Sequence, residues 1–206
     1  MSSPRKVVEL FYDVVSPYSW LAFEVLCRNR PPGMIPNKFF YMSSDLKRVS
    51  EYFGVPVNSP SNVFEAMFEK GSLKAMRFVT AVGEKETEGG MKVENVSREL
   101  WKRIWSTDHD ITEDASLMEA GLKAGLSDDE VQEILTLSKS QPIKDKLKSI
   151  TNDALEYKCF GFPTIVCHVN GKPEIFFGSD RFEVMAHCIG EKWMGPHPEG
   201  NLTANL

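Results

Sequence analysis

The sequence has few cysteines and no cysteine pair. Cys27, Cys159, Cys167 and Cys188 are scattered along the chain, without a C-x-x-C motif and without the spacing of paired zinc ligands. This pattern argues against a dithiol redox centre, a zinc finger and a disulfide framework. We therefore expect reduced, mostly buried thiols.

Histidine pairs are also missing. None of the four histidines has another histidine four residues away, as a helical metal site would require. We expect surface or structural histidines and no bound metal; they are His109, His168, His187 and His197.

Long apolar runs and basic clusters are absent as well. No stretch approaches 18 apolar residues, so no membrane insertion is expected. Lys and Arg number 24 against 29 Asp and Glu, a net charge of −5, and no Lys/Arg cluster marks a nucleic-acid site. The first six residues lead directly into a strand-like segment, without room for a signal peptide or a cleavable presequence. We expect an intracellular soluble protein.

What is present is the composition of a compact globular protein. The 206 residues are 42% hydrophobic and 26% charged, and 13 of them are Phe, which excludes a disordered or fibrous chain. The length suits one domain, or a core with a large insertion.

The two ends of the chain predict one α/β core. Residues 7–12 (VVELFY) predict a strand, and Ser16-Pro17 predicts a helix start. Near the other end, residues 164–169 and 174–177 predict a hairpin around an Asn170-Gly171 type I′ turn. Ser179-Asp180 then predicts the N-cap of a closing helix that runs through Trp193 and ends near Gly195-Pro196.

The middle of the chain, residues 44–157, predicts helices only. One apolar stripe follows helical spacing from Phe64 to Val82, and a second follows it from Val93 to Trp105. Ser127 and Glu130 form a capping box, and Pro142 opens a helix that should reach about Tyr157. We therefore predict a core of residues 1–43 and 158–206 with an all-helical domain, residues 44–157, inserted.

Two segments are candidates for chemistry. Ser16 precedes a predicted helix, where unpaired backbone N–H groups favour an anion, although a plain N-cap role would explain the same serine. Phe162-Pro163 precedes the hairpin, at a place where a cis peptide bond can turn the backbone toward a ligand.

The order of elements resembles the thioredoxin superfamily, in which the start of the first helix faces a cis-proline loop. More narrowly, the chain resembles the kappa-class glutathione transferases. The segments that carry this resemblance, spread over nearly the whole chain, are FYDVVSPYSWLAFEVL, PPGMIP, KGSLKAMRF, SRELWKRIWS, FGFPT and FGSDRFEVMAHCIGEKWMGP.

The resemblance implies a fold, a co-substrate and a site. It implies a thioredoxin-like core (β-α…β-β-α) with an inserted helical domain, and glutathione as co-substrate. Ser16 would be the catalytic residue that holds the glutathione thiolate. The residues that would bind glutathione are Pro17, Tyr18, Asn29, Lys38, Phe162, Pro163, Ser179 and Asp180. Lys38, in the Pro-rich loop, suits the glycyl carboxylate, and Asp180 the γ-glutamyl ammonium.

One departure from the family stands out. The family has a crossover and a second parallel strand before the Pro-rich loop, but here Leu26-Cys27-Arg28 runs directly into that loop. About two dozen residues are missing. A parallel crossover takes a dozen or more residues, so the three residues between the helix and the loop cannot supply the second strand. Either Lys38–Met42 supplies a substitute strand, or the core is a three-stranded remnant whose first strand is an exposed edge. We favour the remnant.

The resemblance implies an enzyme that conjugates glutathione to small electrophiles, such as aryl halides, or reduces hydroperoxides. Two alternatives stay open: a glutathione-dependent isomerase of the 2-hydroxychromene-2-carboxylate type, and a non-catalytic interaction protein if the shortened core cannot assemble the site. The family also implies a homodimer located in mitochondria or peroxisomes. The tail Ala204-Asn205-Leu206 is only weakly similar to a peroxisomal address, which favours the mitochondrial matrix.

Overall fold

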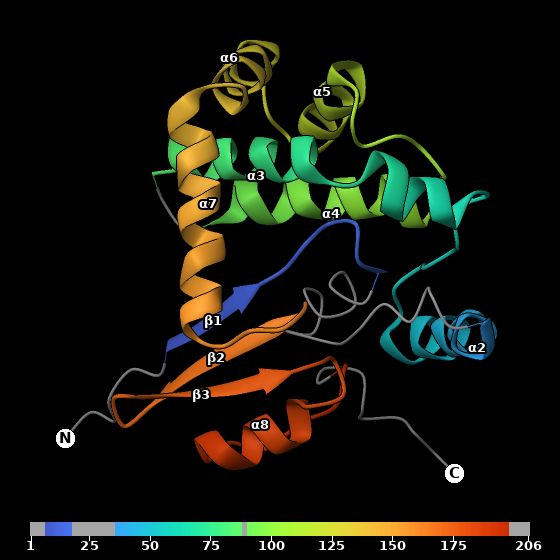
Figure 1. The fold of residues 1–206 in the computed structure, drawn as a ribbon, viewed down its shortest axis with the longest axis vertical. Helices are drawn as coiled ribbons and strands as arrows, with labels where there is room; N and C mark the ends of the chain where they lie inside the picture. Colours follow the sequence, from blue (N-terminus) through green and yellow to red (C-terminus); the bar gives the residue numbers. More distant parts are fainter. Residues whose placement is uncertain (1–6, 18–35, 88–89, 198–206) are drawn as a thin grey trace.

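The computed structural model of the chain describes residues 7–17, 36–87 and 90–197. The three described strands form a small sheet, and helices lie above and below it (Figure 1). In chain order the described elements are β1 (Val7–Phe11), α2 (Pro36–Phe53), the π-helix η1 (Glu65–Lys70), α3 (Leu73–Lys85), α4 (Met91–Trp105), α5 (Asp114–Lys123), α6 (Asp128–Ser138), α7 (Gln141–Glu156), β2 (Thr164–Val169), β3 (Lys172–Phe177) and α8 (Phe182–Ile189).

The sheet has the order β1-β2-β3, and both pairs are antiparallel. The predicted hairpin is confirmed: Asn170 and Gly171 both have positive φ, 52° and 78°, as a type I′ turn requires. Phe11 at the end of β1 and Phe177 at the end of β3 both face Thr164, at the start of β2. Of the described strands, β1 therefore lies at one edge, as the three-stranded remnant requires.

The substitute strand at Lys38–Met42 is not formed. These residues belong to α2, which begins at Pro36, a residue suited to the first helical position. The side chains of Met42, Leu46 and Phe53 are buried at helical spacing and join the same cluster. The burial of apolar residues at helical spacing over three turns favours a helix more strongly than the short aromatic run favours a strand. Helix α2 continues through residues 43 and 44, where we expected the domain boundary.

Both faces of the sheet are covered (Figure 1). On one face, Ile165 and Cys167 of β2 pack with Phe182 and Met185 of α8. On the other, Phe11 and Val166 pack with Ala154 near the end of α7. The alternation along β2 follows the period of two, and its first residues are buried on both sides.

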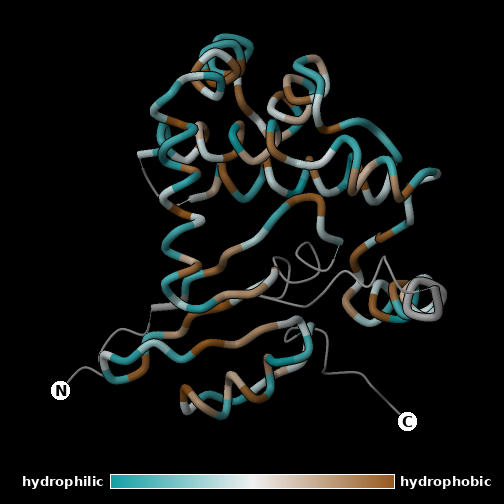
Figure 2. The backbone as a smooth tube through the Cα atoms, in the orientation of Figure 1, coloured by the Kyte–Doolittle hydropathy of each residue, from teal (hydrophilic) through white to brown (hydrophobic). Residues whose placement is uncertain are grey.

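The inserted helices form the largest core. The stripe from Val93 to Trp105 is confirmed: Leu100, Trp101 and Trp105 are fully buried in α4. The other stripe is interrupted, because Gly71 (φ 64°) separates η1 from α3. Phe64, which comes just before η1, is 62% exposed. Figure 2 shows mainly hydrophilic residues along α7, in agreement with the burial of only Ile143 and Ala154 on this helix.

Local signals at the helix ends are confirmed in two places and wrong in one. Ser127 and Glu130 form the predicted capping box, and α7 occupies its predicted range. Ser179-Asp180 does not cap α8, which begins at Phe182 after Arg181 and ends at Ile189, before Gly190 in the left-handed conformation. Trp193 stacks on Phe182 at 5.1 Å from beyond the helix end. No helix in the described ranges is long and apolar enough to span a membrane.

Candidate functional site

Three loops leave the sheet at the same end. Because β1 and β3 both run antiparallel to β2, the chain after Phe11, the chain before Thr164 and the chain after Phe177 all lie there. These are the loops that contain Ser16, Phe162-Pro163 and Ser179-Asp180. The topology therefore gathers the described candidate residues at one edge of the core.

Ser16 lies in a turn that is held by Asp13. The Ser16 N–H donates to the Asp13 carbonyl at 3.1 Å, and the Val15 N–H donates to Asp13 Oδ1 at 2.8 Å. Pro17 is buried and is the first residue in helical conformation, as predicted. Ser16 is itself 8% exposed, so its side chain is largely shielded from water.

Asp13 connects this turn to the inserted helices. The Ser72 hydroxyl donates to Asp13 Oδ2 at 2.7 Å, from the residue that precedes α3. Burial raises the pKa of the Asp13 carboxyl above its ordinary value, and the hydrogen bonds from Ser72 and Val15 oppose this rise. Next to it, the Tyr12 hydroxyl hydrogen-bonds Ser97 of α4 at 2.7 Å. Sequence reasoning assigned no role to Asp13 or Ser72.

The Phe162-Pro163 peptide bond is cis, the isomer that the sequence position allowed. The Pro163 carbonyl accepts a hydrogen bond from the Gly178 N–H at 3.2 Å. This bond ties the proline segment to the chain just before Ser179, so two predicted binding segments are adjacent.

Ser179 and Asp180 have different environments. Ser179 is 3% exposed, while Asp180 is exposed and forms an ion pair with Arg181 at 3.0 Å. The chain turns at these two residues, between the end of β3 and the start of α8. This turn explains why they do not cap the helix.

The remaining candidates are described only in part. Tyr18 and Asn29 lie outside the described residues. Lys38 was expected in a loop but lies in the first turn of α2, and its side chain is outside the described part. Helix α2 lies beyond the same end of the sheet as the three loops (Figure 1), and Met42 and Leu46 of α2 belong to the same buried cluster as Val14.

A cavity of about 1090 Å³ extends from this end of the sheet between α3 and α7. Its lining includes Tyr12, Asp13 and Phe162 from the sheet side, and Met76 and Arg77 from α3. The volume is large enough for a small organic ligand. Sequence reasoning suggested only that some methionines could line a pocket for an apolar co-substrate.

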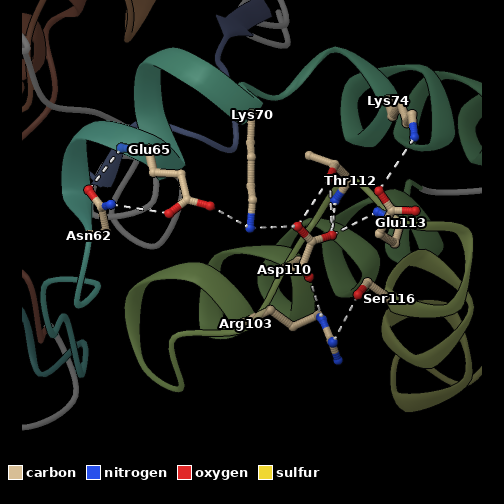
Figure 3. Close-up of polar contacts among 9 residues, drawn as sticks. All are labelled: Asn62, Glu65, Lys70, Lys74, Arg103, Asp110, Thr112, Glu113 and Ser116. Atoms are coloured by element: carbon tan, nitrogen blue, oxygen red, sulfur yellow. Dashed lines mark hydrogen bonds and ion pairs between the residues drawn. The ribbon is translucent and has the colours of Figure 1, made fainter.

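A second polar cluster lies at the junction of η1, α4 and α5 (Figure 3). Lys70 contacts Glu65 at 3.1 Å and Asp110 at 3.5 Å, while the Asp110 carboxylate accepts the N–H groups of Thr112 and Glu113. Each group drawn has a protein partner. The cluster therefore joins the π-helix to the start of α5, a structural role.

The thiols and histidines differ in their surroundings. Cys167 is buried, and burial raises the pKa of its thiol to about 11. Cys188 is exposed on α8, which contradicts the expectation of burial. His168 pairs with Glu9 across the sheet, a structural contact. Within the described ranges, no group of three or more His, Cys, Asp or Glu side chains is arranged to hold a metal.

Comparison with known proteins places this arrangement in a family. Residues 27–190 match the DSBA-like thioredoxin domain family. The human protein named glutathione S-transferase kappa 1 is 44% identical over 217 residues, covering 94% of this chain and 95% of that protein. The rat protein of the same name is 42% identical over 230 residues, covering the whole of both. The solved structure of 2-hydroxychromene-2-carboxylate isomerase matches with a TM-score of 0.66 at 18% identity, covering 89% of this chain and 94% of that one, a likeness of fold alone.

The rat comparison also bears on the missing segment. Its alignment runs over 230 residues although this chain contributes only 206. The difference agrees in size with the two dozen or so residues expected to be missing before the Pro-rich loop.

Proposed function

This chain belongs to the kappa-class glutathione transferases, which have a DSBA-like thioredoxin fold. We propose that the hydroxyl of Ser16 holds the thiolate of bound glutathione for attack on small electrophiles. The tripeptide would lie along the cis-proline segment, where an extended peptide can pair with the backbone of Phe162. Ser179 and Asp180 would receive the γ-glutamyl end. The carboxylate of Asp180 would accept the ammonium group of glutathione. In this structure that carboxylate pairs with Arg181.

The observation that carries this proposal is the convergence of three loops at one end of the sheet. Ser16, Phe162-Pro163 and Ser179 come from distant parts of the sequence, and the strand register with the Gly178–Pro163 hydrogen bond brings their loops together. Tyr18, Asn29 and Lys38 remain part of the proposed site through the family resemblance.

A serine hydroxyl at a helix start can stabilise the thiolate of glutathione enough to keep it ionised at neutral pH. A thiol with a pKa of about 8.5 needs about 2–2.7 kcal/mol of stabilisation to be mostly ionised at neutral pH. A hydrogen bond to a charged group contributes about 1.5–3 kcal/mol. A helix N-terminus contributes about 0.3–1 kcal/mol. A serine hydroxyl at a helix start therefore suffices without a general base.

The experiment compares wild type with Ser16→Ala, using the ultraviolet absorbance of the bound thiolate and the turnover of 1-chloro-2,4-dinitrobenzene. We expect the variant to raise the pKa of the bound thiol by about 1–2 units and to slow conjugation about 10–100-fold. Ser138→Ala is the control, because Ser138 is a buried serine of α6 whose hydroxyl bonds its own helix. An unchanged thiolate titration in Ser16→Ala removes Ser16 from the mechanism.

Two other functions are distinguished by the same assays, with glutathione binding measured and 2-hydroxychromene-2-carboxylate added as a substrate. Absence of turnover together with glutathione binding would favour a non-catalytic interaction protein. Isomerisation of 2-hydroxychromene-2-carboxylate in preference to conjugation would favour the isomerase. The 44% identity to the human kappa protein supports the transferase over both.

We also propose a homodimer in the mitochondrial matrix or the peroxisome, with hydroperoxide reduction as a second activity. The family resemblance supports these points. Sedimentation of the purified protein tests the dimer, and a fluorescent fusion imaged beside organelle markers tests the location.

A further inference from the structure

The cavity between α3 and α7 is lined by two kinds of side chain. Leu73 and Ile150 are exposed apolar residues on opposite walls, with Met76 and Phe162 partly buried between them. Exposed apolar surface in a concave site favours an apolar ligand. The lining also contains charged residues, and their charges are not balanced: four are Lys or Arg and three are Asp or Glu.

The acidic groups that line the cavity all have partners. Asp13 accepts from Ser72, Glu84 pairs with Lys146 at 3.8 Å, and Asp145 accepts from Gln141 at 2.9 Å.

Three cationic side chains of the lining, in contrast, have no partner among the described residues. Arg77, Lys144 and Lys148 have no side-chain acceptor or ion-pair partner among the described residues. Arg77 Nε is moreover buried without an acceptor in that part of the chain. A buried N–H of a guanidinium normally has a hydrogen-bond partner, so this one indicates a missing acceptor.

We propose that this cavity binds an apolar molecule bearing one anionic group, with the anion at Arg77 and Lys144 and the apolar body directed toward Phe162. Arg is suited to this role, since its planar guanidinium can donate two parallel hydrogen bonds to a carboxylate or sulfonate.

The position of Arg77 along α3 sets its backbone distance from the Asp13 turn. Ser72 marks the end of α3 that touches the Asp13 turn, and Arg77 lies five residues further along the helix. At 1.5 Å per residue this is a rise of about 7.5 Å along the helix axis, which leaves room for a substituted aromatic ring between the turn and the cation.

The inference that this ligand is the electrophilic co-substrate rests on the proposed function. In an anionic aryl chloride, the glutathione thiolate forms the C–S bond at the chlorine-bearing carbon. The C–Cl bond breaks and its electron pair leaves with chloride, while the thiol proton has already passed to solvent. The anionic group stays unchanged and only anchors the ring.

The first test measures binding without glutathione. The probes are 8-anilinonaphthalene-1-sulfonate and N-phenyl-1-naphthylamine, which share a ring system and differ in the sulfonate. We expect Arg77→Gln to weaken the sulfonate probe about tenfold or more and to leave the neutral probe within about twofold. Lys144→Gln is the second variant, with an expected loss of about threefold, should Arg77→Gln fail to fold.

The matched control is Lys74→Gln, which removes one positive charge from the same helix outside the cavity, where Lys74 faces Glu113 at 3.9 Å. Unchanged affinity of the sulfonate probe for this control supports the proposal. Equal losses in Lys74→Gln and Arg77→Gln, or no loss in Arg77→Gln and Lys144→Gln, overturn it.

The second test measures conjugation of 4-chloro-3,5-dinitrobenzoate against 1-chloro-2,4-dinitrobenzene. We expect Arg77→Gln to lower the ratio of their kcat/KM values about tenfold, and Lys74→Gln to leave the ratio unchanged. Turnover of both with an unchanged ratio in Arg77→Gln overturns the anionic site as a co-substrate site while the proposed function stands. No turnover of either by wild type, with the probe pattern intact, overturns the proposed function while the anion site stands.

Discussion

The hydroxyl of Ser72 donates to the Asp13 carboxylate at 2.7 Å, across 59 residues of sequence. Ser72 occupies the N-cap position of α3, yet its side chain makes no capping hydrogen bond. Its hydroxyl is used instead to connect the inserted helices to the turn that carries Ser16. Because Asp13 also accepts from the Val15 N–H, the contact fixes the backbone just before the proposed catalytic serine.

We predict that Ser72→Ala destabilises the fold by about 1–3 kcal/mol at neutral pH, since a buried carboxylate loses one of its donors. The loss should shrink on acidification, because a protonated Asp13 no longer needs that donor. Urea unfolding at several pH values measures both effects.

Ser140→Ala is the matched control for this prediction. Ser140 is also an N-cap serine without a capping hydrogen bond, and its hydroxyl has no partner in the described part of the chain. We expect a change below about 0.5 kcal/mol. Equal destabilisation by the two variants would show that the Asp13 contact has no special role.

Gly121 offers a second prediction, on packing. A Cβ at this position in α5 would lie 2.8 Å from Val131 Cγ2 and 3.3 Å from Phe78 Cζ. Gly121→Ala gains about 1 kcal/mol in helix propensity but overpacks a tight contact, which costs about 1–3 kcal/mol. We expect net destabilisation of about 1 kcal/mol, measured by urea unfolding.

Gly83→Ala serves as the comparison, since its Cβ would meet only Val93 Cγ2 at 3.4 Å, an ordinary contact. There the gain in helix propensity should dominate and leave stability unchanged or higher. If Gly121→Ala is as stable as Gly83→Ala, the contact between α5 and α6 is looser than its geometry indicates.

Local signals in the sequence predicted the elements they belong to. The Asn170-Gly171 turn and the Ser127–Glu130 capping box depend on neighbouring residues alone, and both are formed. The aromatic run at Phe39–Met42 was ambiguous as a strand because four residues do not distinguish the two periods. The run is helical because Leu46 and Phe53, further along the chain, continue the helical spacing of buried apolar residues from Met42.

The sequence predicts site residues only where a single residue stands in a recognisable local pattern. Ser16 and Pro163 stand in recognisable local patterns, and the strand register brings their loops together. The Asp13–Ser72 contact arises because the start of α3 meets the turn after β1, and Arg77 Nε is left without an acceptor where α3 lines the cavity. No spacing in the sequence indicates such contacts, since they depend on how distant segments of the chain meet in the fold.

The final prediction concerns acid stability and the Glu119 carboxylate. Glu119 contacts Lys123 at 2.7 Å and the nearly buried Arg103 at 2.6 Å, and these cations lower its pKa from 4.5 to about 2. A carboxyl whose pKa is lower in the folded state adds stability that is complete above pH 4.5 and is lost between 4.5 and 2. Glu119→Gln should therefore be less stable than wild type at pH 7, with the difference declining as the pH falls below 4.5.

Because Glu119 is half exposed, the expected difference is modest, and its pH dependence is the more telling measurement. Glu133→Gln is the control, since Glu133 pairs with Lys85 and both side chains are exposed. Arg103 is 7% exposed and keeps its hydrogen bonds to the Asp110 carbonyl and Ser116 in either variant. We expect a larger shift of the urea midpoint at pH 7 for Glu119→Gln than for Glu133→Gln. A difference that stays constant from pH 7 to pH 3 would mean that the stabilisation does not come from the ionised carboxylate.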